Sequence, residues 1–127
     1  MESGKRNDLE ERLVDFAVSI SALVEALHPT ITEKYLASQL IRSGFSPALN
    51  YGEARSAESP NDFIHKMKIA LKELRETFNA LKILSRIKSE KQEALVASCL
   101  NECNELISIF VKSIQTAERN RQQKKQG

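Results

Sequence analysis

Apolar residues recur at three- and four-residue spacing along almost the whole chain, and this periodicity constrains the fold more than any other feature. The periodic segments predict helices over about residues 8–27, 31–57, 60–87 and 90–117. Only four glycines and three prolines occur among the 127 residues, and no segment carries a strand signal. The sequence therefore predicts an all-α fold, an antiparallel up-down four-helix bundle that forms one domain over residues 1–127.

The second predicted helix has two features of its own. Gly44 and Pro47 lie near its middle, and a proline inside a helix removes a backbone hydrogen bond, so we expect a kink or a short break there. Its apolar arc is broad, yet Tyr35, Phe45 and Leu49 fall outside it. Because one bundle core covers only one side of a helix, this helix is our candidate for an oligomer interface.

Val14 and Val18 point away from the apolar face of the first predicted helix. One interpretation is that they belong to a subunit contact. The other is that they are scattered exposed aliphatic residues, which are common on protein surfaces.

The formal net charge of +2 is distributed unevenly. Residues 118–127 contain four basic side chains against one acidic side chain, a net charge of +3, which leaves −1 for residues 1–117. We expect this segment to be a solvated, fraying tail. A body of nearly neutral charge is not a general nucleic-acid binder, because non-specific affinity scales with the number of phosphates neutralised. The candidates for binding RNA, DNA or an acidic partner are therefore Arg119, Arg121, Lys124 and Lys125. The alternative is that they complement a helix C-terminus and keep it soluble.

No uninterrupted apolar run exceeds four residues, so we expect no transmembrane helix, no signal peptide and a cytoplasmic location. Cys99 and Cys103 lie one helical turn apart on the apolar face of the fourth predicted helix. Two thiols alone are an incomplete zinc site. We expect buried, reduced cysteines that act as small hydrophobic residues.

A polar seam is predicted between the second and third helices. If these helices turn at Ser59-Pro60, positions whose numbers sum to about 119 lie opposite each other. This rule places Glu53 against Lys66, Asn50 against Ile69, Ser46 against Glu73 and Arg42 against Thr77, and it brings Arg42 within reach of Glu73 or Glu76. The interaction candidates are Arg42, Asn50, Glu53, Lys66, Glu73 and Glu76.

Two carboxylates precede a histidine by three residues, Glu25 before His28 and Asp62 before His65. In up-down topology these pairs lie at opposite ends of the bundle, about 35–40 Å apart, so they cannot form one di-metal site. We expect solvated side chains, no metal and no cofactor. With no phosphate loop, nucleophile motif or cofactor fingerprint in the sequence, we assign no catalytic residue.

The stretch that carries the seam resembles a known family. The relevant runs are RSG-x-S-x-x-x-NYGEA from Arg42, ES-x-x-DFIHK from Glu58, KIALKE-x-x-ET from Lys68, and LEERLVDFAVSI at residues 9–20. They are similar to the four helix bundle protein family, first described as proteins encoded in intervening sequences of bacterial large-subunit ribosomal RNA genes. The resemblance implies a bacterial, cytoplasmic up-down bundle that assembles as a ring-like pentamer and has no established enzymatic activity. A related protein, the accessory variability determinant of diversity-generating retroelements, shares this architecture and binds nucleic acid and a reverse transcriptase.

These observations favour a non-enzymatic oligomeric scaffold that binds RNA or DNA, with another protein such as a reverse transcriptase as a further partner class. The first alternative is a protein-interaction module with no nucleic-acid role. The second is an enzyme whose site lies between subunits. Salt-dependent binding of nucleic acid would separate the scaffold from the interaction module, and a ligand bound at a subunit interface would indicate the enzyme.

Overall fold

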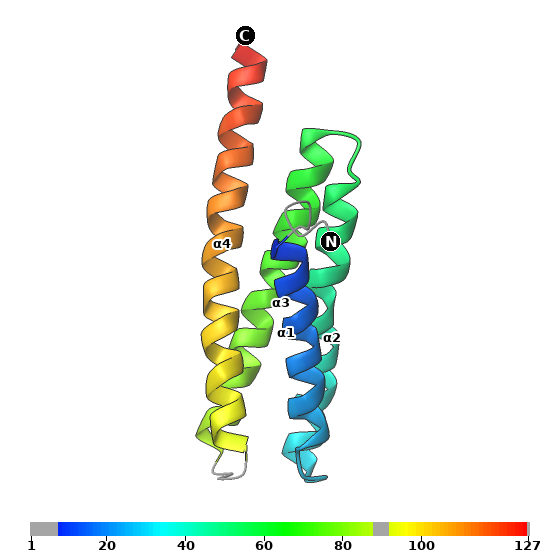
Figure 1. Cartoon of the computed structure of the whole chain (residues 1–127), viewed down its shortest axis with the longest axis vertical. Helices are drawn as coiled ribbons and strands as arrows, with labels where there is room; N and C mark the ends of the chain where they lie inside the picture. The colour runs from blue at the N-terminus through cyan, green and yellow to red at the C-terminus, as the bar shows by residue number, and fades with distance from the viewer. Residues whose placement is uncertain (1–7, 88–91, 127) are drawn as a thin grey trace, which may run out of the picture.

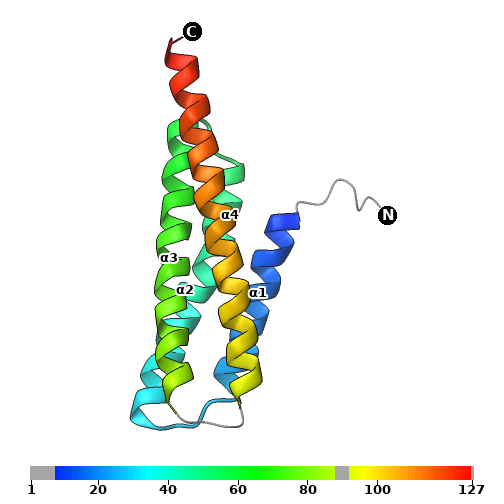
Figure 2. The same cartoon turned by 90° about the vertical axis from the view of Figure 1, so that its left-hand side faces the viewer.

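The computed structural model describes residues 8–87 and 92–126, with side chains up to Lys124 (Figures 1 and 2). The helices are α1 (Asp8–Glu25), α2 (Ile31–Arg55), α3 (Pro60–Arg86) and α4 (Glu93–Gln126). Consecutive helices run in opposite directions, and neighbouring helices pack in the cyclic order α1, α2, α3, α4 (Figure 1). The predicted all-α bundle is confirmed, and the described residues include no strand.

The four helices differ in length. The 18 residues of α1 rise by about 27 Å and the 34 residues of α4 by about 51 Å. Figure 1 shows the consequence, because α4 projects past the turn between α2 and α3 while α1 covers only the opposite part of the bundle. In the part of the chain that the structure describes, α2, α3 and α4 therefore build this end of the molecule without α1.

Two side-chain caps set the starts of the middle helices. The Thr30 hydroxyl accepts from the backbone N–H of Glu33, and the Glu33 carboxylate accepts from the Thr30 hydroxyl and the His28 backbone N–H. This arrangement is similar to a capping box, except that the Glu33 carboxylate reaches the backbone N–H of His28 and not that of the N-cap residue Thr30. At α3, Ser59 accepts from the backbone N–H of Asp62, and Pro60 occupies the first turn, where its missing N–H costs nothing.

α2 runs without a break from Ile31 to Arg55, through Pro47. Of the two outcomes that we expected, a kink or a short break, the break is absent, because Pro47 is buried against the core and packing holds the helix together. The kink stays a prediction. Gly44 lets α1 and α2 approach closely. A Cβ at this position would lie 3.1 Å from both γ carbons of Ile20, which is fully buried.

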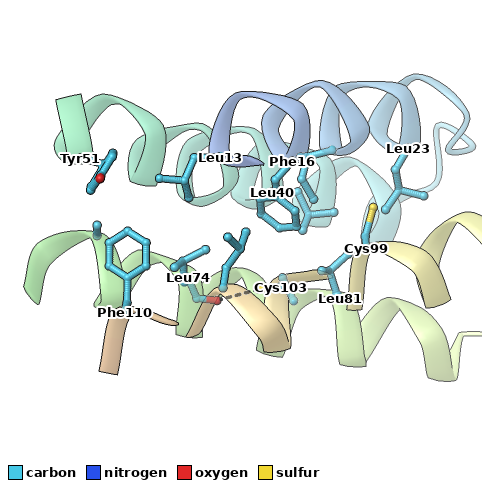
Figure 3. Close-up of a cluster of buried hydrophobic side chains, with 14 of the residues drawn as sticks. Leu13, Phe16, Leu23, Leu40, Tyr51, Leu74, Leu81, Cys99, Cys103 and Phe110 are labelled. Atoms are coloured by element: carbon cyan, nitrogen blue, oxygen red, sulfur yellow. Dashed lines mark hydrogen bonds between the residues drawn. The ribbon is translucent and has the colours of Figure 1, made fainter. Parts of the chain in front are cut away.

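The core consists of large apolar side chains from all four helices (Figure 3). In Figure 3, Leu13, Phe16 and Leu40 from α1 and α2 face Leu74 and Leu81 from α3 across the bundle axis. A further contact joins Tyr51 of α2 to Phe110 of α4, whose rings meet edge to face with centroids 6.0 Å apart. Burial of this kind is the main stabilising term of a bundle.

Cys99 and Cys103 are free and buried, as the periodicity predicts. The Cys103 thiol lies 3.2 Å from the backbone carbonyl oxygen of Leu74 and donates to it. Burial raises the pKa of Cys103 to about 12 and also raises the pKa of Cys99. Both side chains therefore remain protonated thiols at neutral pH, which makes them poor nucleophiles and poor metal ligands.

α4 contains an 18-residue window with a mean hydropathy of 1.4, which by length and composition is enough to cross a membrane. The rule of uninterrupted apolar runs does not detect this window, because an average hydropathy tolerates scattered polar residues. The same helix buries Leu106 and Phe110 in the core. It also carries Glu102 and Glu105, whose carboxylates bind the Arg12 guanidinium of α1 at 2.7 and 3.1 Å. These contacts are typical of the core helix of a bundle.

The prediction of a fraying tail after residue 117 was wrong, since α4 continues to Gln126. The added residues are mostly arginine, glutamine and lysine, which favour helices, and no glycine or proline occurs among them to end one. Two contacts tie this extension to α3. Lys68 Nζ lies 2.9 Å from Glu118 Oε2, and Arg121 Nη1 lies 2.9 Å from Asn61 Oδ1.

Candidate functional site

The predicted polar seam lies along the contact between α2 and α3. These helices are antiparallel and adjacent, so the register set at the Ser59-Pro60 turn extends along both of them. Lys66 Nζ lies 2.6 Å from Glu53 Oε1, which is the predicted pair closest to the turn. The contact confirms the register near the turn.

Arg42 is the centre of the seam. Its Nη1 donates to both carboxylate oxygens of Glu73, at 3.0 and 3.2 Å. Its Nη2 donates to Glu76 Oε1 at 2.6 Å and to Gln39 Oε1 at 2.9 Å. We predicted that Arg42 reaches Glu73 or Glu76, and the guanidinium binds both because its planar fork presents several donors at once.

The electrostatics keep this cluster ionised. The pKa of Arg42 is raised, chiefly by its hydrogen bond to Glu76 and next by that to Glu73. The pKa of Glu76 is lowered, chiefly by the same hydrogen bond from Arg42. The pKa of Lys66 is raised by its hydrogen bond to Glu53. A carboxyl held in its charged form in this way is not poised to act as a general acid at neutral pH.

The seam runs along the border between core and solvent. The Glu73 side chain is only 12% exposed, whereas Arg42 is 52% and Glu76 39% exposed. Near the turn the Glu53 side chain is 60% exposed and its partner Lys66 28% exposed. Solvent screens the outer pairs, so their contribution to stability is small.

Two polar side chains of the predicted seam, Asn50 and Ser46, bond within α2 and form no hydrogen bond to α3 in the described structure. Asn50 donates to the backbone carbonyl and the hydroxyl of Ser46, at 3.1 and 2.8 Å, so both side chains bond within α2. Ser46 was expected opposite Glu73, but Arg42 takes that carboxylate. The physical reason is that an amide four residues from a serine reaches a helix carbonyl more easily than a group on the next helix.

The sequence reasoning missed a buried hydroxyl pair at the inner wall of the seam. The fully buried Thr77 hydroxyl lies 2.8 Å from Ser43 Oγ and 2.9 Å from the carbonyl oxygen of Glu73. Ser43 in turn donates to the carbonyl oxygen of Gln39 at 2.9 Å. We placed Thr77 opposite Arg42, although the pair of positions 43 and 77 satisfies the same register rule to within one residue. This sum of residue numbers could have predicted the contact between Ser43 and Thr77 from the sequence.

The predicted nucleic-acid candidates at the end of α4 differ in their exposure and in their contacts. Arg119 and Lys124 are exposed. Arg121 is half-buried and its guanidinium is bound to Asn61, beside a groove of about 850 Å³ that Pro60 and Phe63 also line. The side chain of Lys125 lies outside the described part of the molecule.

The candidate metal residues are dispersed. Glu25, His28, Asp62 and His65 are all exposed. Among the residues that the structure describes, no group of three or more histidine, cysteine, aspartate or glutamate side chains is arranged to hold a metal ion.

With this geometry in place, the chain was compared with known proteins. The family model described as 23S rRNA-intervening sequence protein matches residues 5–112. The chain belongs to this family. The fold, the helix order and the motifs of α2 and α3 agree with the resemblance noted in the sequence, and the extension of α4 lies mostly beyond the matched residues.

A solved structure supports the assignment. It is the crystal structure of a protein with unknown function from the S23 ribosomal protein family of Bacteroides thetaiotaomicron. The two chains share 32% sequence identity and superpose with a TM-score of 0.70, over 84% of this chain and 97% of the other. No curated protein matches the chain. The family model and the solved structure therefore agree with the helical bundle described above.

Proposed function

We propose that this protein is a non-enzymatic helical scaffold that assembles into a homo-oligomer and binds RNA. The observation that carries the assembly is a set of exposed aliphatic side chains on the outer face of α1 and α2. RNA is the partner class that the family description favours, because the family takes its name from intervening sequences of 23S rRNA. The arrangement of the seam supports a structural role for its carboxylates.

The outer α1–α2 face consists of Val14, Val18, Ile41 and Leu49. Their side chains are 42–67% exposed. The two helices are held in register by the salt bridge between Arg55 and Glu10 and by the close approach at Gly44. That register places the two valines alongside the α2 segment that carries Ile41 and Leu49, so the four side chains lie on one face. Ile31 and Tyr35 extend the exposed apolar surface of α2, at 91% and 64%.

A second copy of the chain is the proposed cover for this face. A stable interface buries about 800 Å² on each partner and has an apolar centre. Burying exposed aliphatic surface contributes about 25 cal/mol per Å², which favours assembly over solvent exposure. The family resemblance implies a pentamer.

The assembly is tested by light scattering coupled to size-exclusion chromatography. The wild-type protein is expected to elute as an oligomer at tens of micromolar. Leu49→Glu places a charge in the proposed interface and is expected to shift the mass toward the monomer. Ile83→Glu is the matched control, because Ile83 is 53% exposed on α3 and lies away from this face. A wild-type monomer, or equal effects of the two variants, contradicts the proposed interface.

The RNA role is tested by fluorescence anisotropy with a labelled single-stranded RNA of 12 nucleotides. Binding is expected at 50 mM salt and is expected to weaken steeply at 200 mM salt, because phosphate contacts release counterions. The absence of binding at 50 mM salt and tens of micromolar protein contradicts an RNA role.

A further inference from the structure

Five basic side chains form a line on the edge of α3 that faces α4 and solvent. This basic stripe consists of Lys68, Lys72, Arg75, Lys82 and Arg86, all of them exposed. Their spacing of four, three, seven and four residues keeps them within an arc of about 80° on the helix. From first to last they span about 27 Å along the axis.

Most of these charges form no salt bridge with a carboxylate in the part of the chain that the structure describes. Lys68 is paired with Glu118, and Lys82 Nζ lies 5.7 Å from the ring centroid of Phe78. In the described ranges, the stripe's other members form no salt bridge. The carboxylates next to them in sequence, Glu73 and Glu76, are both bound by Arg42, and the charge of Lys72 acts on Glu76 only as a weaker neighbour. A row of unneutralised cations attracts an anionic partner.

The near-neutral charge of residues 1–117 hides a separation of charge between helices. α3 contains six basic against three acidic residues, a net charge of +3, and α1 contains five acidic against one basic residue, a net charge of −4. In the cyclic order of the bundle these two helices lie diagonally opposite each other. The nearly neutral net charge of residues 1–117 therefore does not exclude nucleic-acid binding by the bundle. Binding depends on the charge of the surface that contacts the nucleic acid.

The basic stripe borders a groove of about 670 Å³ between α3 and α4. The aliphatic side chains of Leu71, Val111 and Ile114 line it, together with the amides of Asn79 and Gln115. Three stripe residues, Lys68, Lys72 and Arg75, complete the lining together with Glu76, whose carboxylate is bound by Arg42. A volume of this size is in the range that holds a drug-sized ligand, and it is large enough for one nucleotide.

We propose that this α3–α4 edge binds single-stranded RNA, with phosphates along the basic stripe and a base in the groove. The inference rests on the RNA role proposed above and places the binding site on the bundle rather than at the end of α4. Single strands suit the site better than duplexes, because unpaired bases can be turned outward into a groove whereas paired bases cannot. The amides of Asn79 and Gln115 offer the donors and acceptors that base edges require.

The competing occupant is the acidic α1 of a second copy. Its charge complements the stripe, but some of its carboxylates are already engaged, since Glu10 binds Arg55 and Glu11 also has a partner. The exposed valines of α1, Val14 and Val18, belong to the outer α1–α2 face proposed above for assembly, so they are not available to the aliphatic lining of the groove. The binding experiment separates the two occupants.

The test uses a stripe variant that carries Lys72→Gln, Arg75→Gln and Lys82→Gln. Binding to the labelled 12-nucleotide single-stranded RNA is measured by anisotropy from 50 to 200 mM salt. Loss of three phosphate contacts is expected to weaken binding about 10- to 100-fold near 100 mM salt, and to reduce the slope of log affinity against log salt by about 2. Far-ultraviolet circular dichroism verifies that the variant is folded.

The matched control is a tail variant that carries Arg119→Gln, Lys124→Gln and Lys125→Gln. It removes the same number of charges, so a general effect of net charge is equal in both variants. The tail variant is expected to weaken binding by less than about threefold. If it weakens binding as much as the stripe variant does, or more, the site is not on α3 and the inference is overturned, while the proposed RNA role survives.

Two further outcomes are decisive. If the wild-type protein binds no RNA at 50 mM salt, the proposed function fails and the inference fails with it. If the stripe variant binds RNA normally but its oligomeric mass changes in light scattering, the stripe is a contact with a second copy and the inference is overturned.

The groove is tested separately by Asn79→Ala combined with Gln115→Ala. These changes remove no charge, so affinity for the single strand is expected to fall about 3- to 30-fold with an unchanged salt slope. A duplex of the same sequence is expected to bind more weakly than the single strand. Unchanged affinity, or tighter binding of the duplex, contradicts the insertion of a base.

Discussion

The two edges of α3 use charge in opposite ways. On the edge that meets α2, Lys66, Glu73 and Glu76 are bound to oppositely charged groups of the neighbouring helix. On the edge that meets α4, Lys68 is paired and the basic residues that follow it extend into solvent. Charges neutralised within the chain maintain the register of two helices, whereas unneutralised charges are available to a partner. This difference underlies our proposal that the first edge is structural and the second binds a partner.

The largest expected effect on stability belongs to the inner wall of the seam. Thr77→Val removes a fully buried hydroxyl that bonds Ser43 and the Glu73 carbonyl. We expect the free energy of unfolding to fall by about 1–2 kcal/mol, measured by urea denaturation. Thr116→Val, at an exposed position of α4, is the control and should change stability by less than about 0.5 kcal/mol. Equal effects of the two changes would mean that the hydroxyl pair contributes nothing.

The next effect compares two ion pairs within the seam. A double-mutant cycle between Arg42 and Glu73 is expected to give a larger coupling energy than a cycle between Lys66 and Glu53. The reason is burial, because the Glu73 side chain is 12% exposed and the Glu53 side chain 60%. Arg42→Ala and Glu73→Ala should each destabilise the protein by more than Glu25→Ala, which changes an exposed carboxylate of α1. Coupling near zero in both cycles would contradict the structural role of this edge.

The dependence of stability on pH offers a third test. The hydrogen bond from Arg42 lowers the pKa of Glu76 in the folded protein. A carboxyl with a lowered folded pKa stabilises the fold above its unfolded pKa, about 4.3, and this stabilisation is lost as the pH falls through the folded pKa. Glu76→Gln should therefore lose less stability than wild type between pH 6 and pH 3. A variant that follows the wild-type curve would show that the carboxylate is not stabilised by Arg42.

The smallest effect is expected on the other edge of α3. The stripe variant defined above should change the free energy of unfolding at pH 7 by less than about 0.5 kcal/mol, because its three side chains are exposed and form no salt bridge in the described structure. A large loss of stability would show that these charges belong to the fold, and the contrast between the two edges would disappear.

Much of the fold could be predicted because its determinants are local in sequence. Apolar spacing predicts where the helices run, and Ser59-Pro60 fixes the register that brings Glu53 to Lys66. The bonding of Asn50 to Ser46 could not be predicted in this way, because a short polar side chain chooses between its own helix and the next one. We predicted that the fourth helix ends at residue 117, where the apolar pattern ends. The helix continues because the residues after 117 favour helices and because Glu118 and Arg121 contact α3.

The basic stripe was missed for a different reason. The charge of the chain was summed over long segments, and a sum hides the position of each charge around a helix. The spacing of Lys68, Lys72 and Arg75 was visible in the sequence, but its significance depends on which carboxylates the folded chain has already engaged. That information is not local in sequence.

Lysine footprinting tests the contrast between the two edges most directly. The wild-type protein is acetylated briefly with and without the single-stranded RNA, and the modification of each lysine is measured by mass spectrometry. RNA is expected to protect Lys72 and Lys82 on the stripe and to leave Lys66 in the seam and Lys34 on α2 unchanged. Protection confined to Lys124, or equal protection of all lysines, would contradict the account.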